Sequence, residues 1–142
     1  MKKLSFRKLL SANDVGSTGG HQAGVLIPKS ETELLKLLPY LDPSTKNPST
    51  WIDFADENGE LSKFRFVYYN NKLHDDTGTR NEYRITGMTA WFRDKNAQAG
   101  DFIEISSVPG TNKYFMNILP EEIKEKVSEP AKVQLRGWKR VH

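Results

Sequence analysis

Two short segments decide how this sequence is interpreted: LSANDVGSTGGHQAG at residues 10–24 and GTRNEYRIT at residues 78–86. Neither has the apolar periodicity of a core helix or strand. Both are rich in side chains that hydrogen-bond base edges, since Arg suits guanine, Asn and Gln suit adenine, and Glu accepts from cytosine. A purely electrostatic DNA ligand would need only Lys and Arg. This mixture of donors and acceptors predicts two arms that grip double-stranded DNA and read its sequence.

The first segment, residues 10–24, also allows other interpretations. Its Ser, Gly, Asn and Thr residues are ordinary loop formers, so composition alone fits a flexible surface loop equally well. Gly16, Gly19 and Gly20 would let the backbone approach a ligand closely. A phosphate-binding P-loop is a further alternative, although the Gly-Lys-Ser/Thr ending of that motif is missing.

The second segment, residues 78–86, has a charge pattern with a spatial consequence. Arg80, Glu82 and Arg84 alternate in sequence, so on an extended strand their side chains point to the same side. The competing interpretation is an edge strand protected by charges, or an Arg–Glu surface pair that adds little stability.

Strand-like runs dominate the rest of the chain and are aromatic and β-branched, as strands favour. Asn58-Gly59 predicts a hairpin turn between two of them. The predicted strands are Leu4–Leu10, Ala23–Ile27, Trp51–Ala55, Phe64–Tyr69, Phe102–Ser106, Tyr114–Ile118 and Val133–Trp138.

Two short helices are predicted among these strands. One covers Ser30–Leu41, with Ser30 and Glu33 as a capping box and leucines along one face. The other, Glu121–Val127, follows Pro120 and has early glutamates that suit a helix N-terminus. The expected fold class is mainly β with two short α-helices, arranged as a closed or half-closed barrel.

Both segments resemble a known family. The motif SANDxGxTGGHQxG (Ser11–Gly24), the motif TRNExRIT (Thr79–Thr86) and the triplet Tyr68-Tyr69-Asn70 are similar to the EcoRII-type N-terminal domain of some Type II restriction endonucleases. The resemblance implies a B-three-like DNA-binding pseudobarrel of about seven strands, spanning 1–142 as one domain. It also implies a monomeric recognition or effector domain that reads a CCWGG-like site in the major groove, with the cleaving domain elsewhere.

The resemblance, together with the base-reading chemistry, gives a set of expected DNA contacts. The sequence departs from the family pattern at Gly78 and Tyr83, where the family has lysines, so two positive charges are lost and the target is left open. The expected contacts are Arg7, Lys8, Ser11, Asn13, Asp14, Ser17, Thr18, His21, Gln22, Thr79, Arg80, Asn81, Glu82, Tyr83 and Arg84.

Composition limits the remaining possibilities. The chain has 142 residues, 37% hydrophobic and 27% charged, with a net charge of +3, which fits one compact soluble domain. The resemblance implies a prokaryotic cytoplasm as its location. Basic residues are frequent at both ends of the chain. Arg7 and Lys8 are expected to contact DNA phosphates, and the alternative is that both ends are solvated tails. The absence of cysteine excludes disulfides and thiol chemistry. No apolar run is long enough for a membrane span.

No catalytic residue, cofactor or metal is expected, but a nuclease interpretation needs a test. His21 and His74 lack an obvious third metal ligand. Glu122-Ile123-Lys124 has the Glu-x-Lys spacing of metal-dependent nucleases, although glutamates are ordinary at the start of a helix. A self-contained metal-dependent nuclease and a transcription-factor-like regulator therefore remain the alternatives to a restriction-enzyme recognition domain.

Overall fold

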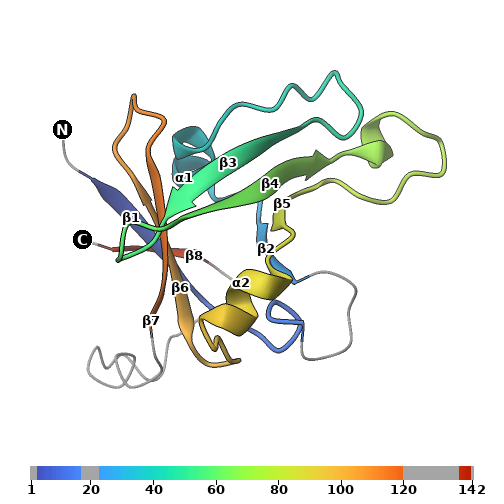
Figure 1. Ribbon diagram of the computed structural model, residues 1–142. Helices are drawn as coiled ribbons and strands as arrows, with labels where there is room; N and C mark the ends of the chain where they lie inside the picture. Colours follow the sequence, from blue (N-terminus) through green and yellow to red (C-terminus); the bar gives the residue numbers. More distant parts are fainter. Residues whose placement is uncertain (1–2, 17–22, 120–137, 142) are drawn as a thin grey trace.

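Eight β-strands form one sheet that curls into a nearly closed barrel (Figure 1). The computed structural model describes residues 3–16, 23–119 and 138–141. The order in the sheet is β2-β5-β4-β3-β7-β6-β1-β8, with β3 and β7 parallel and the other neighbours antiparallel. The strands are β1 (Leu4–Leu9), β2 (Gly24–Ile27), β3 (Ser49–Ala55), β4 (Leu61–Tyr69), β5 (Glu82–Thr86), β6 (Phe102–Ser107), β7 (Tyr114–Leu119) and β8 (Trp138–Val141).

The predicted mainly β barrel is confirmed. The sequence analysis did not predict two of its strands: β5, which lies inside the second segment that it interpreted as an arm, and β8, which shares only Trp138 with the predicted strand Val133–Trp138. The predicted turn at Asn58-Gly59 is also confirmed, because the Gly59 N–H donates to the Asp56 carbonyl at 2.9 Å between β3 and β4.

Alternating side chains fill the barrel from the long β3–β4 hairpin. Ile52 and Phe54 on β3 and Phe64 and Phe66 on β4 are at most 4% exposed, and residues between them face solvent. The rings of Phe54 and Phe64 lie 5.9 Å apart, centroid to centroid. The period of two thus places one face of each strand in a common apolar core.

The two edge strands of the sheet, β2 and β8, are joined by a side chain. The indole N–H of Trp138 on β8 donates to the carbonyl of Leu26 on β2 at 3.0 Å. Trp138 is only 7% exposed, so this hydrogen bond is shielded from water. Nearby, Arg140 on β8 pairs with Glu33 at 2.6 Å. These contacts close the barrel between two edges that have no ladder between them.

The first helix is shorter than predicted. Helix α1 covers Thr32–Leu37, and its N-cap residue is Glu31, which makes no side-chain cap. The predicted capping box of Ser30 and Glu33 is therefore wrong. The helix ends early because Leu38 takes an extended conformation (ψ 161°), as the residue before a proline prefers. Of the predicted leucine face, Leu34, Leu37, Leu38 and Leu41 are buried, and Leu35 is partly buried.

Two other helical segments were not predicted. Helix α2 (Thr89–Asp94) buries Trp91 and Phe92, and the 3₁₀ turn η1 covers Asn71–Leu73. Each is too short for its periodicity to be recognised in the sequence. The predicted helix Glu121–Val127 lies outside the described residues, as does the predicted strand before Trp138. In the described part of the chain, no helix is long and apolar enough to cross a membrane.

Candidate nucleic-acid interface

The two segments reach the same pair of strands from opposite ends. The first segment connects β1 to β2, and the second connects the β4 side of the barrel to β5. Because β2 and β5 are antiparallel, Gly24 at the start of β2 lies opposite Thr86, whereas Tyr83 near the start of β5 lies opposite Ile27. Three residue steps along a strand cover about 10 Å. The first segment and the loop part of the second segment (residues 78–81) therefore join the short β2–β5 pair at its opposite ends (Figure 1).

A buried ion pair fixes the base of the first segment. The Lys8 ammonium donates to the Asp14 carboxylate and to the Leu9 carbonyl (3.2 Å), and the two charged side chains are 5% and 9% exposed. The same carboxylate oxygen accepts from the Ser11 N–H at 3.0 Å, while the Asp14 N–H donates to Ser11 Oγ at 3.1 Å. The carbonyl of Asp14 accepts from the Gly24 N–H at 3.0 Å, so both ends of the segment meet at this residue.

The return end of the first segment packs closely on β5. A Cβ atom on Gly24 would lie 2.3 Å from the Ile85 carbonyl oxygen, so only glycine fits there. The neighbouring Ala23 N–H donates to Thr89 Oγ1 at 3.1 Å, and the Ala23 carbonyl accepts from the Met88 N–H at 3.1 Å. The first segment is therefore anchored on the strand that carries the second.

The expected contacts of the first segment divide by their placement. Lys8 and Asp14 are buried, so their charged groups face each other rather than solvent. Ser11 and Asn13 are exposed. Outside the described residues lie Ser17, Thr18, His21 and Gln22.

Glu82 is the centre of the second segment. Its Oε2 atom accepts from Arg84 Nε and from Arg80 Nη2, the latter at 3.3 Å. Partial burial raises the pKa of the Glu82 carboxyl, but the hydrogen bonds and charges of Arg84 and Arg80 outweigh it, and the pKa lies below its ordinary value. The carboxylate is thus ionised at neutral pH, and the three side chains share one side of the strand, as their alternation predicted.

The position of Arg80 is fixed through both its backbone and its guanidinium. Its N–H donates to Asn71 Oδ1 at 2.8 Å, and its carbonyl accepts from the Lys72 N–H at 3.0 Å. The guanidinium carbon lies 3.8 Å from the centroid of the Tyr69 ring. Stacking on an aromatic face leaves the N–H groups at the guanidinium edge available to an acceptor. With 42% of its side chain exposed, Arg80 is presented to solvent in a defined orientation.

Asn81 is turned toward the protein. Its Oδ1 atom accepts from the Tyr68 hydroxyl and from Lys29 Nζ, the latter at 3.3 Å. A bidentate contact with adenine needs both the oxygen and the nitrogen of the amide. In this arrangement the oxygen is already used, and Asn81 connects the second segment to β4 and to the end of β2.

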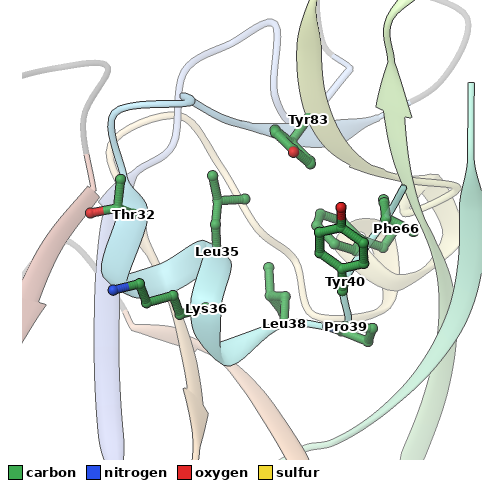
Figure 2. Close-up of a pocket in the computed structure, with 9 residues that line it drawn as sticks. Thr32, Leu35, Lys36, Leu38, Pro39, Tyr40, Phe66 and Tyr83 are labelled. Carbon is green, nitrogen blue, oxygen red and sulfur yellow. The ribbon is translucent and has the colours of Figure 1, made fainter. Parts of the chain in front are cut away.

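Tyr83 points to the other side of β5 from Glu82 and Arg84. Its ring stacks on Tyr68 at 4.2 Å with an angle of 9°. Tyr83 lines a hollow of about 370 Å³. Figure 2 shows it there together with Tyr40, Phe66 and side chains of α1. Burial, followed by the neighbouring Tyr68 and Tyr40, raises the pKa of the Tyr83 hydroxyl, which therefore stays neutral at pH 7.

The backbone at the start of the second segment is closely packed. A Cβ atom on Gly78 would lie 2.2 Å from the carbonyl oxygen of Asn71, so any side chain would displace the backbone here. The next residue, Thr79, is exposed. Glycine at position 78 thus allows the chain to pass close to the backbone of Asn71.

Asn70 holds the base of the second segment against a loop of distant residues. It is fully buried. Its Nδ2 donates to the carbonyls of Pro43 (3.2 Å) and Thr45 (2.9 Å), and its Oδ1 accepts from the Asn47 N–H at 2.7 Å. Its own N–H donates to Asn47 Oδ1 at 3.0 Å. His74 Nε2 also lies 2.9 Å from the Pro43 carbonyl, so the loop and residues 70–74, which lead into the second segment, form one unit.

Asn70→Ala should lower the free energy of unfolding by at least about 2 kcal/mol, because it leaves buried backbone groups without partners. Urea denaturation measures this. The control is Asn112→Ala in an exposed turn, which should stay within about 0.5 kcal/mol of the parent. Equal stability of the two variants would contradict the role given to Asn70.

Arg7 and the histidines complete the predicted set. Arg7 Nε pairs with Glu104 Oε2 at 2.8 Å, and the Arg7 side chain is 29% exposed. The described residues contain no group of three or more His, Asp or Glu placed to hold a metal ion.

The sequence analysis did not single out the positioning contacts of Tyr69, Asn71 and Lys29, because these depend on chain segments that meet only in the fold.

Comparison with known proteins adds independent findings. The family model described as "Restriction endonuclease EcoRII, N-terminal" matches residues 2–101. The Type II restriction enzyme EcoRII of Escherichia coli is 42% identical over 84 residues, which cover 57% of this chain and 20% of that protein. The B3 domain-containing transcription factor NGA3 of Arabidopsis thaliana is 29% identical over 103 residues, or 72% of this chain and 25% of that protein.

A solved structure shares the fold. The structure described as "Arabidopsis FUS3-DNA complex" superposes with a TM-score of 0.61 at 21% identity, covering 82% of this chain and 97% of that chain. The chain thus spans a fifth to a quarter of the curated relatives it matches, and nearly all of a B3-type solved chain.

Proposed function

Because this chain belongs to the restriction endonuclease EcoRII N-terminal family, we propose that it binds double-stranded DNA sequence-specifically and reads bases with the second segment. The observation that carries the proposal is the row of Arg80, Glu82 and Arg84, joined by hydrogen bonds on one side of β5. A row with donors at both ends and an acceptor between them suits base edges better than phosphates alone.

The charged groups of this row lie close together, because Arg84 Nε and Arg80 Nη2 both donate to Glu82 Oε2. Neighbouring bases of one DNA strand are about 3.4 Å apart along the helix axis, so such a compact group suits neighbouring base pairs. In this proposal Arg80 and Arg84 donate to guanine N7 and O6, and Glu82 accepts from cytosine N4. The target therefore includes G·C pairs, in keeping with a CCWGG-like site.

Other expected contacts take supporting roles in this proposal. Lys8 and Asp14 set the base of the first segment, Asn81 holds the second segment to β4, and Tyr83 packs against Tyr68. Their burial and partners support these roles. Direct contacts are assigned to the exposed Ser11, Asn13 and Thr79, to Ser17, Thr18, His21 and Gln22, and to Arg7 at phosphates.

We further propose that the chain recognises DNA as a monomer and does not cut it. It serves a restriction endonuclease in a prokaryotic cytoplasm, and the nuclease domain of that enzyme lies elsewhere in the full polypeptide or in a partner protein. The EcoRII relative, of which the matched region is 20%, supports this role. The B3 transcription-factor relative supports a regulator as the second candidate.

In vitro selection from random duplexes should recover one G·C-containing site, bound without a divalent metal. Added Mg²⁺ should produce no cleavage by the purified chain. Recovery of duplexes that share no common sequence would refute sequence-specific binding. Mg²⁺-dependent cleavage that is lost in both Glu122→Ala and Lys124→Ala would instead establish a self-contained nuclease.

A further inference from the structure

From Arg84, the outward-facing residues of the sheet lead toward the first segment. Register partners in antiparallel strands share a face, and Arg84 on β5 lies opposite Val67 on β4. Two residues further along, Arg65 on β4 lies opposite Thr86 on β5 and opposite Trp51 on β3. Thr86 in turn lies opposite Gly24, where the first segment returns to the barrel. Arg65 and Trp51 therefore lie beside the Gly24 end of the β2–β5 pair, on the same face as Arg84.

Arg65 differs from most described arginines in its partners. Arg7, Arg80, Arg84 and Arg140 each pair with a carboxylate. Within the described ranges Arg65 has no such partner, and its Nε donates to the neutral Ser49 Oγ at 3.0 Å. This contact orients the guanidinium while its full positive charge and its terminal N–H groups stay exposed. An oriented, exposed guanidinium of this kind suits a phosphate group.

Trp51 is the neighbour of Arg65 and is unusually exposed. Its relative exposure is 62%, whereas Trp91 and Trp138 are 8% and 7% exposed. The next cross-strand pair on the same face of the β3–β4 hairpin is Asp53 with Lys63, whose charges lie 4.0 Å apart and compensate each other. The unpaired charge of this face is therefore concentrated beside the segments rather than toward the hairpin tip.

We propose that Arg65 and Trp51 form a further contact with the same DNA duplex, where Arg65 binds a backbone phosphate and Trp51 packs against the adjacent sugar. This rests on the proposed function. It also extends it, since neither residue belongs to the two segments. The positive charge favours an anionic partner over an apolar protein surface, and the shared face with Arg84 places that partner on the bound duplex. Arg65 should contribute affinity without sequence preference.

The three tryptophans give a direct test. Because only Trp51 is well exposed among them, acrylamide, a neutral quencher, should act mainly on Trp51 fluorescence in the free protein. Saturation with the selected duplex should remove most of this quenching. The Trp51→Phe variant should lack the quenchable component with and without DNA, which identifies the signal.

Affinity provides the second readout. Arg65→Gln should weaken binding roughly tenfold on selected and random duplexes alike, as loss of a charge-assisted hydrogen bond implies. The slope of log affinity against log salt should fall by about one. The control is Lys113→Gln in the β6–β7 turn, which lies on the opposite side of the barrel from the segments (Figure 1) and should change neither quantity.

Either of two results overturns the proposal: Trp51 remains equally quenchable in the complex, or Arg65→Gln keeps the parent salt slope. If Trp51 were protected from acrylamide in a protein sample that contains no DNA, this face would bind protein. That outcome would also overturn the proposal. Failure of the parent chain to bind any duplex is a distinct result, which would refute the proposed function itself.

Discussion

Asp14→Ala should lower the free energy of unfolding by about 3–5 kcal/mol, the cost of leaving one charge of a buried pair without its partner. The Lys8 ammonium would keep only the Leu9 carbonyl at 3.2 Å, in a site where its side chain is 5% exposed. Urea denaturation of the variant and the parent measures the difference.

Two variants separate this effect from a general sensitivity of the fold. The double variant Lys8→Met/Asp14→Leu should recover most of the lost stability, because apolar side chains of similar size often replace a buried pair without loss. Asp75→Ala removes an exposed pair with Lys46, whose side chains are 41% and 51% exposed, and should cost at most about 1 kcal/mol. An Asp14→Ala effect no larger than that of Asp75→Ala would mean that Lys8 escapes to solvent.

Arg80→Ala and Arg84→Ala should each remove about 1–3 kcal/mol of discrimination between the selected duplex and a duplex altered at one G·C pair. Each arginine is held in position before DNA arrives, Arg80 by the Tyr69 ring and both by Glu82. Competition binding at fixed salt measures the discrimination for every single-pair alteration of the site.

Glu82→Gln tests the centre of the same row. It should relax specificity at one pair while strengthening binding to random DNA, because it removes a negative charge that now neutralises two arginines. Lys113→Ala is the control for loss of a distant positive charge. Equal weakening of selected and random duplexes in all three second-segment variants would mean that the row clamps phosphates and does not read bases.

The sequence by itself determined the features that depend on neighbouring residues. The strand period of two placed Ile52, Phe54, Phe64 and Phe66 inside the barrel. The same period brought Glu82 and Arg84 to one side of β5, where Arg80, just before the strand, also reaches Glu82. Asn58-Gly59 closed the hairpin as its turn chemistry requires. Motifs within the two segments were sufficient to indicate the family.

Only the tertiary structure decided which distant groups meet. The charge of Lys8 suggested a phosphate contact, but the chain turns at Ser11 and brings Asp14 against it. Asn81 faces the protein because Tyr68 and Lys29 reach its oxygen. Arg65 and Trp51 gained their place beside the segments from the register of β3, β4 and β5. The physical reason is that a strand's own pattern defines its inner face, whereas register and charge pairing depend on packing between segments far apart in the chain.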